Sequence, residues 1–403
     1  MTFFAGLRGT GSFGTGERPQ DFREMILWTN PNGKAPLFAL TAKMKKEACS
    51  DPQIHWWEET NTIARATVNG AIGDATTTTI VVDTAASGIG GALQFAPGDL
   101  LQVEEDIAAY TTEILKVASV ASDTSMTVVR GAAGSTAASF ADDAGLTRIG
   151  SAHEEGSSSP TTVTSNPTKF TNYTQIFKTP YQLSRTAENT QFRSGDPLKN
   201  DQIRKSFVHS EKLEQALFWG MASESTGSGG LPERTMGGMR EFVTSNRTQF
   251  SVDPTIDTFI AALSPVFDYE AGAAGDERII YAGNGAINYL NKLVAAQSTT
   301  QINYEGEIEI YGQKLRKFSV PQGSFAIKSH PLMNVHPVYT YSMFIVNPSG
   351  LLYRPLKNSD TKIQKNIQAN DADLRKDQWL TECTFEIHYE QSFGYIGGFK
   401  DFP

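Results

Sequence analysis

The chain has 403 residues, of which 39% are hydrophobic and 20% are charged, and its formal net charge is −9. This length allows two or three domains, each able to bury its own core. The acidic balance argues against a repressor or a polymerase, because binding to nucleic acid depends on a basic face. The densest basic run, at residues 43–46, holds three lysines and is followed by Glu47.

The two cysteines, Cys49 and Cys383, are far apart in the sequence and lack C-x-x-C spacing. A disulfide framework or a zinc site is therefore not expected, and both should be reduced thiols. The first residues lack the basic start and apolar core of a signal peptide. No stretch approaches the roughly 18 apolar residues of a membrane span. We expect the protein to be made and kept in a cytoplasm, without membrane contact.

The chain begins with a segment that is expected to be an arm. Residues 1–20 contain five glycines, two arginines and a proline. Such a segment cannot offset its own ordering entropy by burying apolar surface. Residues 1–45 are therefore predicted to be an N-terminal arm and linker, which is either free or ordered by a neighbouring subunit.

Residues 62–150 differ in character from the rest of the chain. Short β-branched runs alternate with turn residues, which predicts a small all-β domain; the runs lie at 76–83, 99–104, 113–118 and 125–130. This stretch holds ten acidic and only four basic residues. Its flanks, 55–60 and 170–177, look like the outgoing and the returning segment of one extended loop. The domain is therefore predicted to be an insertion in an extended loop region at 46–190.

The next part of the chain is dominated by one long helix signal. Asp196 is a suitable N-cap, and Pro197 suits the first helical position. Together they predict a helix over 196–221, with Ile203 on its apolar face. The Ser- and Gly-rich residues 223–230 are predicted to be a flexible loop after this helix.

The remaining residues mix helix and strand signals without a strict βαβ rhythm, which predicts an α+β fold. Asp253 and Pro254 repeat the same start signal and predict a helix over 253–267. Residues 284–294 have apolar residues at helical spacing. Strands are predicted at 307–311, 313–318, 343–346 and 384–389.

Several functional motifs are present only in fragments. The G-x-G-x-x-G pattern at residues 9–14 has no strand before it, and Pro19 interrupts any helix after it, so it is not expected to bind a dinucleotide. His330 and His336 are the closest of the six histidines, but they lack the partners of a zinc site. We predict no catalytic, cofactor-binding or metal-binding residues, and the protein is not expected to be an enzyme.

Two aromatic neighbours and one cysteine have both a functional and a structural interpretation. Trp56 and Trp57 could stack on a base or a sugar, but paired tryptophans more often anchor an interface or cover a core. Cys383 lies in a strand-like run, where a small buried hydrophobic residue is the ordinary explanation.

Three features together resemble a known family. The first is the order of the predicted parts: an N-terminal arm, an extended loop, a long helix, a domain of helices and strands, and terminal strands. The second is the stretch 281–290, followed by Tyr311, Gly312 and Phe318. The third is residues 347–355, followed by Trp379, Cys383, Gln391, Gly394 and Gly397. The chain resembles the major capsid proteins of tailed bacteriophages that have the Hong-Kong-ninety-seven type of fold.

The resemblance implies a division of the chain into parts. Residues 191–252 would form a peripheral domain whose spine is the helix 196–221. Residues 253–370 would form an axial domain, and residues 371–403 would be C-terminal strands that return to the peripheral domain. The region 46–190 would then be the family's extended loop, carrying the insertion.

The resemblance also implies a function. Copies of the chain would assemble into pentamers and hexamers, forming an icosahedral head around double-stranded phage DNA. The expected location is the virion, assembled in the cytoplasm of the host bacterium. Besides itself, its partners would be portal and scaffolding proteins and a decoration protein, with only non-specific DNA contact, no membrane and no cofactor.

Three alternatives remain open at this point. The first is an encapsulin-like shell protein of cellular origin, which would enclose an enzyme. The second is a tail adhesin that binds carbohydrate through Trp56, Trp57 and the all-β domain. The third is a hydrolase whose site residues are scattered along the sequence.

Overall fold

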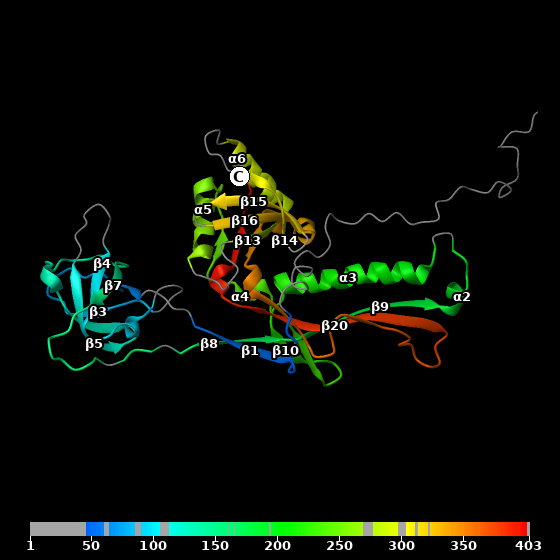
Figure 1. Cartoon of the computed structure of the whole chain (residues 1–403), viewed down its shortest axis with the longest axis horizontal. Helices are drawn as coiled ribbons and strands as arrows, with labels where there is room; N and C mark the ends of the chain where they lie inside the picture. The colour runs from blue at the N-terminus through cyan, green and yellow to red at the C-terminus, as the bar shows by residue number, and fades with distance from the viewer. Residues whose placement is uncertain are drawn as a thin grey trace, which may run out of the picture. The chain divides into compact units, whose positions relative to one another are not determined.

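The computed structural model describes residues 46–59, 64–84, 90–104, 113–160, 162–164, 166–192, 195–268, 277–296, 304–310, 313–320 and 323–400 (Figure 1). The predicted N-terminal arm and the G-x-G-x-x-G pattern lie outside these residues. The chain divides into two compact units. Trp56–Phe170 forms one of them, which we call the β unit, and the residues on either side of it form the main unit.

The β unit is built from six antiparallel strands in the order β2-β7-β4-β5-β6-β3. Val68, just after β2, bridges Val82, just after β3. The N–H of Asp83 donates to the carbonyl of Thr67 at 2.9 Å. The two outer strands therefore meet, and the sheet closes into a barrel. The strands are β2 (Arg65–Thr67), β3 (Thr79–Val81), β4 (Asp99–Glu104), β5 (Ile114–Ser122), β6 (Ser125–Val129) and β7 (Gly145–Ser151).

The barrel has a core of its own, separate from that of the main unit. Alternate residues of β4 are buried, and Leu101 packs with apolar side chains of the other strands. A buried ion pair joins Arg130 to Glu113 at 2.8 Å. Glu113 also accepts the N–H groups of Gly131 and Ala138. Burial alone would raise the pKa of Glu113, but these donors hold it below its ordinary value.

Two paired strands carry the chain into and out of the β unit. They are β1 (Gln53–Glu58) and β8 (Thr168–Tyr173), which form a two-stranded sheet. The boundary between the units falls within both strands. The sequence predicted an all-β domain at 62–150, and the barrel strands lie between Arg65 and Ser151.

The main unit contains a mixed seven-stranded sheet in the order β12-β21-β17-β13-β16-β15-β14. Its central strand, β13, runs parallel to β16 and antiparallel to β17. Together with the helices described below, this sheet confirms the predicted α+β class. The strands are β12 (Arg247–Gln249), β13 (Glu277–Ala282), β14 (Tyr304–Ile310), β15 (Gln313–Val320), β16 (Gly323–Ser329), β17 (Met343–Val346) and β21 (Gly394–Gly397).

Helices cover both faces of this sheet because β13 is apolar on both sides. Ile280 packs in one cluster with residues of α5 (Ile256–Leu263) and α6 (Asn284–Ala296). Tyr281, the next residue, packs in a second cluster with Leu217 and Phe218 of α3 (Pro197–Trp219). A strand buried on both faces lies at the centre of a layered core.

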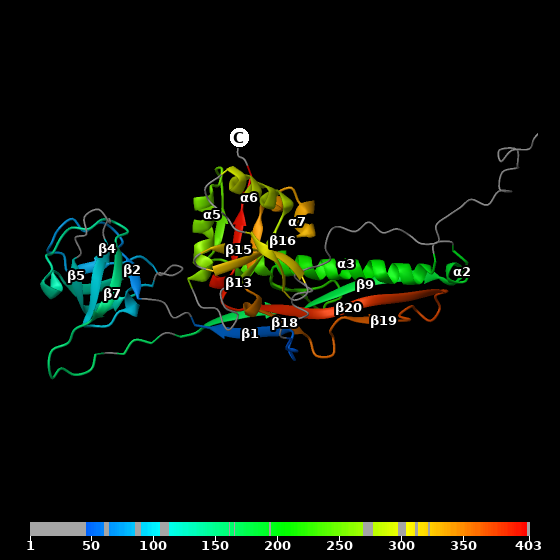
Figure 2. The ribbon, with the colours of Figure 1, turned by 45° about the horizontal axis from the view of Figure 1, so that its top comes forward.

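The long helix α3 lies along an extended ribbon of strands (Figure 2). Asp196 caps its first turn by accepting the N–H of Leu198 at 2.9 Å, and Pro197 occupies the first helical position. In the ribbon, β20 pairs with β9 along one edge and with β18 and β19 along the other. The strands are β9 (Gln175–Ser184), β18 (Leu351–Pro355), β19 (Lys362–Gln364) and β20 (Leu374–Ile387).

Three local predictions around the helices were wrong. Ile203, placed on the apolar face of α3, is 65% exposed, because the buried residues of α3 lie in its second half. The predicted loop at 223–230 instead begins a hairpin of β10 (Ser223–Thr226) and β11 (Pro232–Thr235). The helix predicted at 253–267 begins later, because Thr255 rather than Asp253 is the N-cap of α5, through a capping box with Thr258.

The last part of the chain is divided between the two sheets. β20 belongs to the ribbon, whereas β21 inserts between β12 and β17 in the seven-stranded sheet. The residues 371–403, expected as one set of strands returning to the peripheral domain, thus serve both sheets. In the same way, β18 and β19 lie within the expected axial range 253–370 but pair with β20. Local strand signals do not specify the pairing partner, so the sequence could not have shown this.

Candidate functional site

The two closest histidines have separate partners in the structure. His330 is fully buried, and its Nε2 lies 2.7 Å from Oε1 of Glu214 on α3. His336 caps the C-terminal end of the short helix α7 (Pro331–Val335), and its Nδ1 accepts the N–H of Val338 at 3.1 Å. The two rings therefore do not share a partner. Among the described residues, no group of three or more His, Cys, Asp and Glu side chains could hold a metal ion.

The His330–Glu214 pair joins α3 to the seven-stranded sheet. Nδ1 of His330 accepts the N–H of Leu332, so Nε2 carries the proton and donates to the Glu214 carboxylate. The rings of Phe218 and Tyr281 stand edge-on to the imidazole, with centroids at 4.8 and 5.8 Å. The pair thus fixes the position of α3 on the sheet.

A second buried histidine joins α3 to the ribbon. Nδ1 of His209 lies 3.0 Å from Oγ1 of Thr179 on β9. Its Nε2 lies 2.7 Å from Oγ1 of Thr381 on β20. Burial lowers the pKa of His209 to about 4, with a smaller contribution from the charge of Lys212. His209 is therefore neutral at pH 7, and it bridges two strands from the helix.

Both cysteines are buried and free, and Cys383 is the small buried residue that was predicted. Cys383 lies opposite Pro355 in the β18–β20 pairing, and the N–H of Cys49 donates to the Pro355 carbonyl at 2.9 Å. Although distant in sequence, the two residues are thus near each other in the fold. Burial raises the pKa of both thiols, which makes them poor nucleophiles at neutral pH.

The two adjacent tryptophans face opposite sides of β1. Trp56 is buried, stacks on Phe170 at a centroid distance of 5.7 Å, and donates from Nε1 to Glu58. Trp57 is 63% exposed. Because the side chains of successive strand residues point in opposite directions, the two rings do not form a common stacking platform. Trp56 is part of the local packing, as the structural interpretation predicted.

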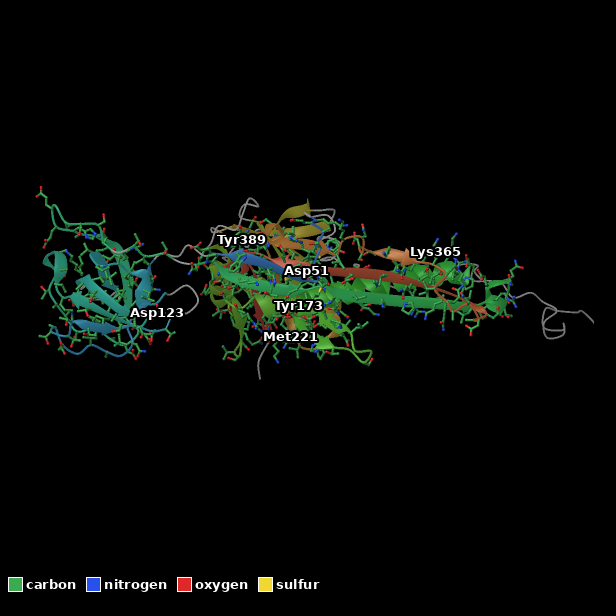
Figure 3. The ribbon with its side chains drawn as sticks, turned by 90° about the horizontal axis from the view of Figure 1, so that it is seen from below. Asp51, Asp123, Tyr173, Met221, Lys365 and Tyr389 are labelled. Carbon is green, nitrogen blue, oxygen red and sulfur yellow. The ribbon has the colours of Figure 1, made fainter. Side chains whose placement is uncertain are left out.

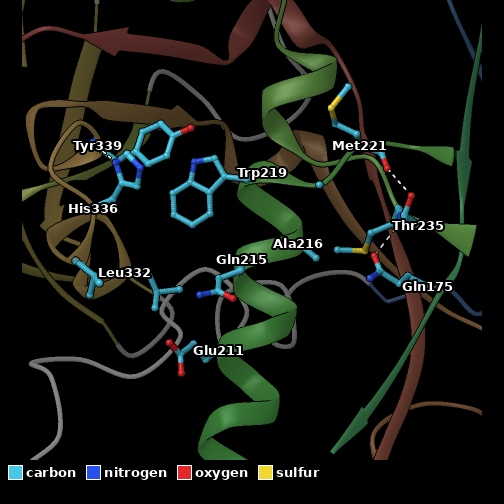
Figure 4. A pocket seen from close by; sticks show the side chains of 13 residues that line it. Gln175, Glu211, Gln215, Ala216, Trp219, Met221, Thr235, Leu332, His336 and Tyr339 are labelled. Carbon is cyan, nitrogen blue, oxygen red and sulfur yellow. Dashed lines mark hydrogen bonds between the residues drawn. The ribbon is translucent and has the colours of Figure 1, made fainter.

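One surface feature of the described residues is an apolar pocket of about 720 Å³ on the main unit (Figure 4). It lies between the end of α3, the start of β9, the β11 strand and α7, with Trp219, Met221, Met236, Leu332 and Tyr339 among its lining residues. Met221 and Val335, which also line it, are 62% and 80% exposed. An open apolar hollow of this kind is typical of a surface that binds another chain.

Sequence reasoning missed this pocket for a physical reason. Its walls come from four segments that are far apart in the sequence, and no single segment has an unusual composition. The close approach of α3 to the base of the hairpin brings them together: a Cβ on Gly220 would lie 2.4 Å from the Ala216 carbonyl and 2.5 Å from the Met236 carbonyl.

Other exposed features lie along the ribbon and the hairpin. Figure 3 shows the main unit from below. Asp51, Tyr173 and Lys365 are labelled on the face that is turned toward the viewer. Nearly every residue of the β10–β11 hairpin is exposed, and a two-stranded hairpin is at best marginally stable alone in water. None of the described helices has the length and apolar character needed to span a membrane. These surfaces are suited to contact with other chains.

Comparisons of the sequence with known proteins give two matches, and both are to major capsid proteins. The family model described as SU10 major capsid protein matches residues 8–400. The major capsid protein of Pseudomonas phage PaMx41 is 25% identical over 357 residues, which cover 83% of this chain and 78% of that protein.

Solved structures with similar arrangements include two phage capsids. The cyanophage A-1(L) capsid asymmetric unit matches 96% of this chain and 97% of its own at 10% identity, with a TM-score of 0.44. The capsid of Myoviridae phage XM1 matches 94% and 96% at 8% identity, also with a TM-score of 0.44. The family assignment rests on the sequence match over residues 8–400, which spans nearly the whole chain. The chain belongs to the SU10 family of bacteriophage major capsid proteins, which are structural proteins that form the phage head.

Proposed function

We propose that the head built by this major capsid protein is an icosahedral shell of pentamers and hexamers around double-stranded DNA. We also assign to the chain a fold of the Hong-Kong-ninety-seven type. The observation that carries this proposal is the long helix α3 lying on the ribbon of β9 and β20, next to a separate helix-covered sheet. This combination gives one chain both a rigid elongated part and a compact part.

The parts of the chain receive roles within this proposal. α3 would be the spine of the peripheral domain, and the seven-stranded sheet with α5 and α6 would be the axial domain at the centre of a capsomer. The β1–β8 pair would be the extended loop, with the β unit as its insertion. The N-terminal residues would be an arm that neighbouring subunits order.

Exposed features of the main unit support assembly. The apolar pocket beside α3 and the exposed β10–β11 hairpin would gain stability when a neighbouring subunit covers them. Closed symmetric shells bury such surfaces by repeating the same contacts around each capsomer. Both features are therefore expected at subunit boundaries.

Partners beyond the chain itself belong to the same proposal. A head of this kind would need a portal, and it would use a scaffolding protein during assembly in the bacterial cytoplasm. The acidic β unit is suited to bind a basic decoration protein. Contact with packaged DNA would be non-specific, in keeping with the net charge of −9.

Electron microscopy with sedimentation tests the proposal. The protein would be expressed alone and together with the products of neighbouring open reading frames. Closed shells, or rings of five and six subunits, are expected. A monodisperse monomer or trimer under every condition would contradict it.

A further inference from the structure

A second, smaller pocket of the main unit has a different chemical character from the apolar one. It has a volume of about 330 Å³ and lies where β12 and the short helix α4 (Met239–Phe242) meet the end of α3. Its walls include the rings of Trp219, Phe344 and Tyr395. Two arginines, Arg240 on α4 and Arg247 on β12, also line it, and none of the described residues that line it carries a carboxylate.

The two arginines have no counter-ion in the described part of the chain. Neither guanidinium group forms an ion pair or a hydrogen bond there. The nearby acids are occupied by other donors: Glu241 accepts the N–H of Ala222 at 2.6 Å, and Glu390 accepts the N–H of Thr244 at 3.2 Å. The pocket therefore carries two positive charges that the described residues around it do not neutralise.

Trp219 and Tyr395, which also line the pocket, each carry a hydrogen-bond donor. The Nε1 atom of Trp219 is buried and has no hydrogen-bond partner in the described chain, and a buried donor without a partner is costly. Burial raises the pKa of the Tyr395 phenol, while Ser342 and the charges of Arg247 and Arg240 act in the opposite direction. The arginines are thus close enough to influence groups inside the pocket.

We propose that this pocket receives the carboxylate side chain of an Asp or Glu from a neighbouring copy of the chain in the shell. Guanidinium groups bind carboxylates through paired, charge-assisted hydrogen bonds, and Arg240 and Arg247 are both exposed, so a side chain of another subunit can reach them. This inference rests on the proposed assembly into a shell.

Charge complementarity identifies a second copy as the occupant. The chain carries nine more acidic than basic residues, and residues 62–150 alone hold ten acids and four bases. Every subunit therefore offers surplus carboxylates to its neighbours. Packaged DNA is a weaker candidate, because duplex phosphates are bound by basic stripes rather than by a pocket with two cations.

Charge reversal tests the contact. In R240E/R247E, the fraction of protein that sediments as shells should fall by more than about tenfold, because the pocket would repel the carboxylate. R240Q/R247Q should show a smaller loss. The matched control is K199E/R204E on the exposed first turns of α3, which changes the net charge equally and should assemble like the wild type. Melting temperatures would show that all three variants fold.

A cross-link identifies the partner group. In shells of R240K, a carbodiimide can condense the new amine with a carboxylate in direct contact, the reagent taking up the water that is lost. Shells assembled from an equal mixture of ¹⁴N- and ¹⁵N-labelled chains should then give cross-linked peptides that pair position 240 with an Asp or Glu of the other isotope. Cross-links between peptides of the same isotope only would overturn the inference.

The remaining outcomes separate the inference from the proposed function. If the wild type forms no shells, the proposed function fails. If the wild type forms shells and R240E/R247E forms them equally well, the proposed function stands and the pocket inference is wrong. One more outcome would contradict the inference. R240E/R247E and K199E/R204E could both assemble normal shells before packaging, while only R240E/R247E fails to retain packaged DNA. The anion bound by the pocket would then be a phosphate.

Discussion

At the scale of single residues, α3 is held in place by two buried histidines with different partners. His330 donates to a carboxylate on α3, whereas His209 reaches from α3 to two threonine hydroxyls. The sequence could not predict these roles, because histidine spacing along the chain does not show which side chains meet in the fold. Cys383 was predictable, since its burial is expected from the apolar strand around it.

The lowered pKa of His209 predicts a pH-dependent stability. The unfolded chain binds a proton at the ordinary pKa of 6.5, while the folded protein binds it only near pH 4. The unfolding free energy should therefore be highest above pH 6.5 and should fall by up to about 1.4 kcal/mol per pH unit between 6.5 and 4. In H209Q this contribution should be absent. Denaturant unfolding at pH 7 and pH 5 measures the difference.

The control for this prediction is H153Q, at an exposed histidine of the β unit, which should keep the wild-type pH dependence. A wild-type slope that survives unchanged in H209Q would show that other groups cause it.

At the scale of elements, the sequence predicted the position of the long helix α3 more accurately than the structure of the hairpin that follows it. The Asp-Pro signal placed the start of α3 correctly, because Asp196 caps its first turn, whereas the same signal at Asp253 and Pro254 did not mark the start of α5. The β10–β11 hairpin was missed because its polar, glycine-containing sequence has no strand alternation. Ile203 was misplaced because the buried residues of α3 lie in its second half, and the sequence does not show which turns of a helix are covered.

The end of α3 is set by a close backbone contact, which predicts the effect of a single methyl group. A Cβ on Gly220 would lie 2.4 Å from the Ala216 carbonyl and 2.5 Å from the Met236 carbonyl. G220A should therefore lower the unfolding free energy by about 2–4 kcal/mol, since the backbone must shift. G229A, in the hairpin turn with nothing near its Cβ, should have little effect. Equal melting temperatures for the two variants would contradict this account.

At the scale of the whole molecule, the order of elements could be predicted, but the pairing of strands could not. The family resemblance rested partly on that order, and the match to the family model confirms the resemblance. The placement of β21 beside β17 depends on contacts across about fifty residues, which no local pattern records. The two arginines of the smaller pocket were missed for the same reason, since only the fold brings α4 and β12 together.

The β unit is predicted to fold without the main unit. Its strands close into a barrel, its apolar residues form a core of their own, and its buried Glu113–Arg130 pair is internal. A fragment of residues 56–170 should therefore unfold in one cooperative transition, followed by circular dichroism on heating. A fragment of residues 71–170 lacks β2, so the barrel could not close and two strand edges would be exposed. That control should unfold without a cooperative transition or aggregate. If both fragments behave alike, closure of the barrel is not what stabilises the β unit.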